Sequence, residues 1–184
     1  MELRDKKLRD GLQKLYYAQI IAIVSLLSTI LVMIPVLGLL IVVVVIVATI
    51  VGLVLTIMGL VKLGDVHSNY TIALILSIIS GVMGLLNKTT VISVLGIILD
   101  LVVIWLLVKT TNCFLGRIER TDVMQKGNRA LVCNIAAVLI SILCTLLSLF
   151  MVELSILLLV VALIVSLVGL VFYVVYLKQA SEAF

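Results

Sequence analysis

The sequence is poor in the side chains on which metal sites and most catalytic sites depend. It contains a single histidine, His67, and three cysteines that are far apart, at positions 113, 133 and 144. A metal site needs several ligands close together, and an enzyme needs an acid–base pair or a nucleophile with its base. We therefore predict no metal site, no cofactor and no catalytic function.

Charge and proline are also scarce. Charged residues make up 12% of the chain and proline occurs once, at Pro35, whereas 65% of the residues are hydrophobic. Soluble domains are about 45–50% apolar and about 25% charged. This composition leaves no room for a separate soluble domain, or for the basic, aromatic-rich surface that binds nucleic acid. We predict one all-α integral membrane domain covering residues 1–184.

Long uncharged runs give the number of membrane spans. No charged residue lies between Lys14 and Lys62. That stretch is too long for one span of about 20 residues, or for the core of about 7–15 residues in a cleaved signal. Pro35 and Gly38 interrupt it, so we expect two spans joined by a tight turn. The same reasoning predicts a bundle of six transmembrane helices in three hairpins, near residues 15–34, 37–61, 69–86, 91–108, 130–151 and 154–177.

The basic residues lie almost entirely on one side of this arrangement. Of the 13 Lys and Arg residues, all except Lys88 fall in the N-terminal tail, in the 109–129 loop, or at Lys62 and Lys178. Basic residues are concentrated on the cytoplasmic side of a membrane. We therefore predict that both termini and the 109–129 loop, the longest loop, are cytoplasmic. The protein is then a multi-pass protein of the plasma (inner) membrane.

Small and hydroxylated residues recur every three or four positions in the predicted spans. Two such stripes are Thr49–Gly52–Thr56–Gly59 in the second span and Ser77–Ser80–Gly81–Gly84 in the third. Residues at this spacing share one face of a helix, and small residues allow helices to pack closely in lipid. We favour this packing role over a pore-lining role.

One acid lies inside a predicted span. In the stretch SVLGIILDLVVIW, residues 93–105, Asp100 shares a face with Ser93 and Gly96. The nearest basic residue along this helix is Lys109, about 13 Å away along the axis. An unpaired ionised acid is too costly in dry lipid, so Asp100 must be protonated, hydrogen-bonded, or open to water and a cation. It is either an ion or proton site or a neutral acid that fixes helix packing.

Three further polar residues belong to the predicted bundle: Gln19, Asn134 and Tyr173. Gln19 and Asn134 each follow a basic residue by five positions, so they enter their spans at the same depth. With Tyr173 they form either a cytoplasmic vestibule or, as we favour, two packing amides and part of an interfacial aromatic belt.

Two basic segments have amphipathic patterns. In the N-terminal tail, Leu8, Leu12 and Leu15 fall on one face, opposite the basic residues. The 109–129 loop carries candidate contacts for anionic lipids at the cytoplasmic face. These are Arg117, Arg120, Lys126 and Arg129. Docking of a partner and a merely solvated loop are the alternatives.

These features predict a polytopic membrane protein that acts within the bilayer, because very short predicted loops leave little recognition surface outside it. We predict transport or conduction of a small ion or solute, with Asp100 as the ion or proton site. The alternative is a non-catalytic accessory or scaffold protein. Such a protein binds a membrane partner or forms a homo-oligomer, since six slim helices enclose little space for a pore of their own.

Overall fold

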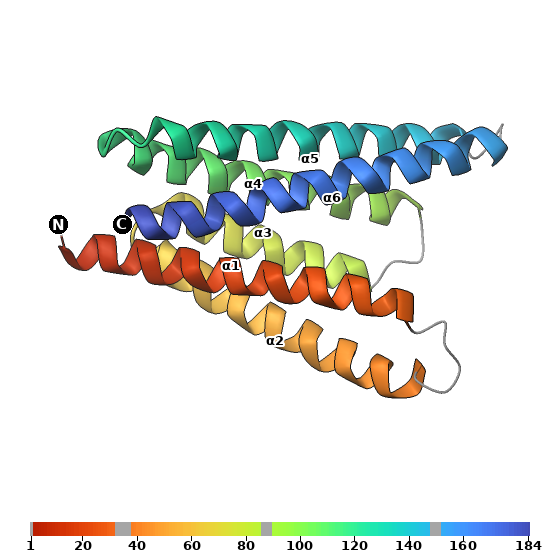
Figure 1. Cartoon of the computed structure of the whole chain (residues 1–184), viewed down its shortest axis with the longest axis horizontal. Helices are drawn as coiled ribbons and strands as arrows, with labels where there is room; N and C mark the ends of the chain where they lie inside the picture. Colours follow the sequence, from red (N-terminus) through yellow and green to blue (C-terminus); the bar gives the residue numbers. More distant parts are fainter. Residues whose placement is uncertain (1, 32–37, 86–89, 148–151) are drawn as a thin grey trace.

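The computed structural model describes residues 2–31, 38–85, 90–147 and 152–184. Within these residues the chain forms six helices, and the predicted all-α fold is confirmed. The helices are α1 (Glu2–Leu31), α2 (Gly38–Gly64), α3 (Ser68–Leu85), α4 (Thr90–Arg117), α5 (Thr121–Leu147) and α6 (Val152–Ala183) (Figure 1). Pro35, expected in the first turn, lies outside the described residues.

The helices pair as three hairpins that close into a ring. α1 packs along α2, α3 along α4 and α5 along α6, which confirms the predicted hairpins. Each hairpin also contacts the next, and α1 contacts α6. Both chain termini lie at the same end of the bundle (Figure 1). We call this end, with the α2–α3 and α4–α5 turns, the polar end; it comprises residues 2–15, 60–73, 107–130 and 173–184.

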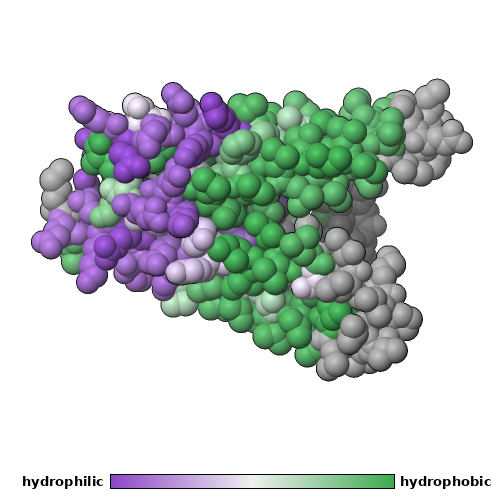
Figure 2. All heavy atoms as spheres, in the orientation of Figure 1, coloured by the Kyte–Doolittle hydropathy of each residue, from purple (hydrophilic) through white to green (hydrophobic). Residues whose placement is uncertain are grey.

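The surface beyond the polar end is apolar, as Figure 2 shows. Within the described segments, four helices are long and apolar enough to cross a membrane: Ile41–Gly64, Val94–Arg117, Thr121–Cys144 and Leu157–Ala183. α3 has a shorter apolar stretch, Ser68–Met83. Large aliphatic side chains such as Val44, Val132 and Leu157 are more than 60% exposed. Apolar surface of this extent is stable in lipid rather than in water, so the chain is a multi-pass membrane protein.

The segment 109–129, predicted as the longest loop, is almost entirely helical. α4 continues to Arg117, and α5 begins after a connection of only three residues. In this connection Glu119 has a left-handed φ of 56°, and the Arg120 amide donates to the Leu115 carbonyl at 3.1 Å. This is the Schellman pattern, which commonly ends helices. The loop prediction was wrong because it followed hydropathy, and a helix that leaves a membrane keeps its backbone hydrogen bonds while its side chains become polar.

α1 likewise begins before its apolar part, where its amphipathic pattern faces the protein itself. Leu8, Leu12 and Leu15 are at most 2% exposed and pack among buried side chains of the other helices. α1 approaches α2 closely here: a Cβ atom added to Gly59 would lie only 3.0 Å from the Gly11 carbonyl oxygen. The leucine face predicted in the tail therefore binds the bundle rather than the lipid surface.

Two ion pairs join the start of α1 to the end of α2. Lys62 Nζ lies 3.0 Å from Asp10 Oδ2, and Lys7 Nζ lies 2.8 Å from Asp65 Oδ2. The hydrogen bond from Lys62 lowers the pKa of the Asp10 carboxyl below its ordinary value of 3.8. All four side chains are partly exposed, so the pairs fix the register of the two helices more than they add stability.

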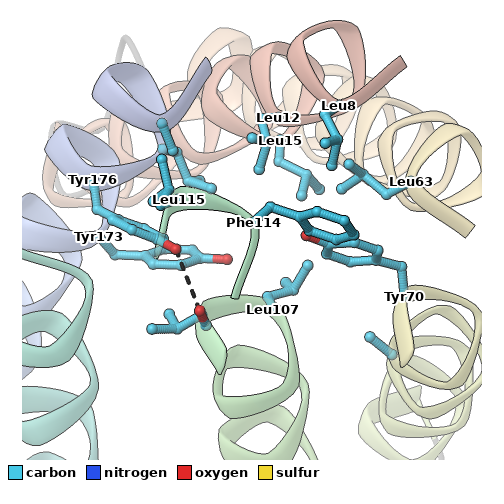
Figure 3. Close-up of a cluster of buried hydrophobic side chains, with 14 of the residues drawn as sticks. Leu8, Leu12, Leu15, Leu63, Tyr70, Leu107, Phe114, Leu115, Tyr173 and Tyr176 are labelled. Carbon is cyan, nitrogen blue, oxygen red and sulfur yellow. Dashed lines mark hydrogen bonds between the residues drawn. The ribbon is translucent and has the colours of Figure 1, made fainter. Parts of the chain in front are cut away.

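The polar end holds the main buried core of the described chain (Figure 3). All six helices contribute large side chains to it, including Leu63, Tyr70, Leu115 and Tyr176, which are fully buried. Beyond the polar end the buried residues are small ones, such as Ala162. Burial of apolar area drives folding where water is the alternative solvent, whereas close contact between small residues joins helices in lipid. The two halves of the bundle therefore follow different packing rules.

Candidate functional site

A cleft of about 840 Å³ lies between the first and second hairpins, in the apolar part of the bundle. Its walls come from α1, α2 and α3, with one residue from α4. Most lining side chains are small or aliphatic. The polar ones are Gln19, Ser25, Thr49, Thr56, Ser77, Ser80 and Asp100.

The two stripes of small residues predicted in the second and third spans both reach this cleft. Thr49, Gly52 and Thr56 line it from α2, and Ser80 and Gly81 line it from α3. The stripes therefore leave space between α2 and α3 beyond their short turn. The favoured interpretation, in which these faces only pack helices together, is incomplete, because a cleft forms where they meet.

Asp100 reaches the cleft beside α3. Its Oδ1 atom accepts a hydrogen bond of 2.6 Å from the Ser80 hydroxyl, which also lies 3.3 Å from the Gly96 carbonyl oxygen. Ser80 is 7% exposed, whereas Asp100 is exposed. No hydrogen bond joins the second carboxylate oxygen, Oδ2, to the described residues.

Gln19 lines the same cleft from α1, although the backbones of α1 and α4 do not pack against each other among the described residues. The hydroxyls of Thr49 and Thr56 donate to carbonyl oxygens of their own helix, at 2.8 and 2.9 Å. Because their hydroxyl protons are engaged in these bonds, the two threonines can act toward the cleft only as hydrogen-bond acceptors.

The charge of the cleft comes from one group. Among its described lining residues Asp100 is the only ionisable one. These parts of the chain also contain no group of three His, Cys, Asp or Glu side chains that could hold a metal ion. Ions such as Ca²⁺ require six or more oxygen ligands, whereas the described lining of this cleft offers a single carboxylate.

The other two predicted polar residues of the bundle lie elsewhere. Asn134 Nδ2 donates to the Ala130 carbonyl at 2.8 Å, and its amide side chain packs beside Gly169 of α6. Tyr173 is 3% exposed and lies in the buried core, where its ring centroid is 6.5 Å from that of Tyr176. The structure therefore does not gather Gln19, Asn134 and Tyr173 into one vestibule.

A buried polar network at the polar end was missed by the sequence analysis. Three consecutive residues near the end of α4 bond to side chains of three other helices. The contacts are Asn69 Nδ2 to Thr110 Oγ1 (3.2 Å), Tyr70 Oη with Thr111 Oγ1 (2.8 Å), Tyr176 Oη to Asn112 Oδ1 (3.0 Å) and Asn112 Nδ2 to Asn128 Oδ1 (3.0 Å). The sequence feature that could have indicated this network is the run of uncharged polar residues at 110–112, which follows Lys109 at the end of an apolar span. Its members bond inside the protein, unlike the charged residues that usually follow a span.

Three of the predicted lipid contacts lie near the start of α5. The Arg120 guanidinium is paired with Asp122 at 3.1 Å, and this pairing lowers the pKa of the Asp122 carboxyl. Lys126 Nζ donates to Gln179 Oε1 of α6 at 2.7 Å. Arg129 is exposed. Their role as lipid contacts stays a prediction.

The fourth predicted lipid contact, Arg117, is the last residue of α4. Its guanidinium and that of Arg4 each lie 5.4 Å from the centroid of the Phe114 ring. Both arginines line a cavity of about 370 Å³, together with Asp5 and Phe184. Asp5 Oδ1 lies 3.9 Å from Arg4 Nε, so the wall carries charges of both signs.

Comparison with models of known protein families, with curated proteins and with solved structures finds no match to this chain. Its function must therefore be argued from the cleft and its residues.

Proposed function

We propose that this protein moves a proton or a monovalent cation through the membrane, with Asp100 as the binding site. One observation carries the proposal. Asp100 and Gln19, which come from different hairpins, line one cleft whose only described charge is the Asp100 carboxylate. Acids within membrane spans are costly, and they mark ion pathways and proton relays.

We also propose that all six helices cross the membrane and that the polar end faces the cytoplasm. In α4, Lys109 Nζ lies 4.5 Å from the centroid of the Trp105 ring, and both side chains are exposed. Trp and Lys are typical of the membrane–water interface. The hydrophilic residues gather at the polar end (Figure 2). The excess of basic residues there supports a cytoplasmic location for both termini in a plasma (inner) membrane.

Beyond this interface the helices continue into the cytoplasm as a folded layer. α1 contributes residues 2–14 and α4 contributes residues 110–117. At 1.5 Å per residue, these segments project about 12–20 Å from the membrane. The surface available to a partner outside the membrane is therefore larger than the short loops alone provide, because the projecting helices add to it.

The test of the function is ion flux in proteoliposomes. We expect wild-type protein to dissipate an imposed gradient of H⁺, Na⁺ or K⁺, followed with an internal pH-sensitive dye or an ion electrode. Asp100→Asn should abolish this flux, and Asp100→Glu should retain part of it. Asp122→Asn is the matched control, because it removes an exposed carboxyl outside the membrane and should leave flux unchanged.

Folding of each variant is checked by circular dichroism and by size-exclusion chromatography in detergent. Equal flux for folded Asp100→Asn and wild type would contradict the proposal. That result would favour the accessory or scaffold role, in which the acid fixes helix packing and its substitution alters stability alone.

A further inference from the structure

We infer that the cleft takes a lipophilic organic cation, such as an alkyl or aryl ammonium or phosphonium. This inference rests on the proposed function, because it names the class of substrate that the Asp100 site would carry. It depends on three properties of the cleft: its size, its walls and its single charge.

The cleft has the size of a small-molecule site. Its volume of about 840 Å³ falls within the range of about 300–1,000 Å³ that is usual for ligand pockets. A bare alkali ion or a proton fills only a small part of such a space. The rest of the volume would have to hold water or lipid beside apolar walls, whereas an organic cation would fill it.

The walls are suited to hydrocarbon and poorly suited to a dehydrated metal ion. Aliphatic side chains line the cleft from three helices: Ile21, Val45, Leu53, Ile57, Ile78 and Val82. An inorganic cation that loses its water needs a set of oxygen ligands in place of its hydration shell. Of the described oxygens in this cleft only the two of Asp100 carry charge. An organic cation needs only one counter-ion, because its apolar groups gain from contact with the aliphatic walls.

The charge of the ligand would be recognised by Asp100 alone. The Ser80 hydroxyl holds Oδ1 at 2.6 Å, which fixes the carboxylate and leaves Oδ2 for the cation. Ser80 is therefore a positioning residue. The described lining contains no aromatic ring, so no cation–π contact replaces the carboxylate if it is removed. Binding should then depend strongly on this one acid.

Equilibrium binding of radiolabelled tetraphenylphosphonium to the purified full-length protein in detergent tests the inference. We expect saturable binding of one molecule per chain. Asp100→Asn should weaken it roughly 30-fold or more, as is usual for loss of one partner of a desolvated charge pair. Asp100→Glu should retain most of the affinity. Tetraphenylborate has the same shape and the opposite charge, and we expect no saturable binding of it.

A second variant tests the cleft without altering its charge. A Cβ atom added to Gly81 would meet no atom within 4 Å, and Gly81 lines the cleft. Gly81→Leu should therefore fold normally, fill part of the cleft and weaken tetraphenylphosphonium binding. It also keeps the inference falsifiable if Asp100→Asn is poorly folded.

The possible results separate this inference from the proposed function. Absence of saturable tetraphenylphosphonium binding would overturn the inference. So would equal binding of tetraphenylborate, or binding unaffected by both Asp100→Asn and Gly81→Leu. If Asp100-dependent flux of H⁺, Na⁺ or K⁺ persists in such an outcome, the proposed function stands and only the substrate class is wrong. Loss of both signals would remove the function as well.

Discussion

The hydrogen bond between Tyr70 and Thr111 offers a direct test of how the polar end holds the bundle together. The two hydroxyl oxygens are 2.8 Å apart, and the residues are 0% and 1% exposed. Tyr70→Phe and Thr111→Val each remove one hydroxyl with almost no change in shape. The bond joins α3 to α4 within the core cluster, so its loss should be measurable in the stability of the whole bundle.

The expected free energies follow from burial. Either single substitution leaves the other hydroxyl buried with its main partner gone, which costs about 1–3 kcal/mol. The double variant Tyr70→Phe/Thr111→Val replaces both partners with apolar groups of the same shape, and such replacements are nearly neutral. We therefore expect the loss in the double variant to be smaller than the sum of the two single losses, by at least about 2 kcal/mol.

The measurement is reversible unfolding in mixed detergent micelles with increasing sodium dodecyl sulfate, followed by far-ultraviolet circular dichroism. Tyr17→Phe is the matched control, because Tyr17 is 48% exposed, and its effect should be within about 0.5 kcal/mol. Additive losses in the double variant would refute a direct bond between the two hydroxyls. Absence of a loss in both single variants would refute the claim that the site is dry.

Two further changes test the helix contacts of the polar end by the same unfolding assay. A Cβ atom on Gly127 would lie 2.7 Å from the buried ring of Tyr176, so Gly127→Ala should lower the free energy of unfolding by about 1–3 kcal/mol. Gly116→Ala is the control: the nearest neighbour of its Cβ atom is Met124 at 3.8 Å, and it should raise the free energy of unfolding by about 0.5 kcal/mol. A gain in stability for Gly127→Ala would disprove the close approach of Gly127 to Tyr176. Because Lys62 lowers the pKa of Asp10, this carboxylate stabilises the fold above its ordinary pKa of 3.8, and the effect is lost as pH falls below that value. The free energy of unfolding of wild type should exceed that of Asp10→Asn by a few tenths to about 1 kcal/mol at pH 7, and this difference should shrink progressively as the pH is lowered below 3.8. A difference that stays constant with pH would exclude the ion pair as its cause.

Hydropathy and helical periodicity predicted much of this fold. Charge-free runs of span length predicted six helices in three hairpins. The spacing of Leu8, Leu12 and Leu15 indicated an apolar helix face, but not that this face packs inside the bundle. The ends of the helices were wrong wherever a helix continues past its apolar part. Hydropathy indicates which residues favour lipid and not where the helical backbone ends, so residues 109–117 of α4 were predicted to be a loop.

The candidate site could be predicted only in part. Asp100 was conspicuous because a carboxylate inside an apolar run has few explanations. Its partner Ser80 was seen only as one small residue among several, since sequence spacing relates residues of one helix and says little about which helices meet. Gln19 lines the same cleft from another hairpin, and the packing of one hairpin against another has no local signal in the sequence. Thr111 was overlooked for the opposite reason, because a buried polar residue lowers hydropathy just as an exposed one does.

The position of the buried core has a mechanical consequence for the cleft. All six helices are fastened to one another at the polar end, while the cleft residues lie farther along the same helices. Helices that are held together at one end move most easily at the other end, so the buried core acts as a pivot. Regions with few buried contacts are those that move at low cost, so we expect α2 and α3 to move relative to each other at the cleft more readily than in the core. Substitutions at the pivot, although distant from Asp100, should therefore change how fast the cleft opens.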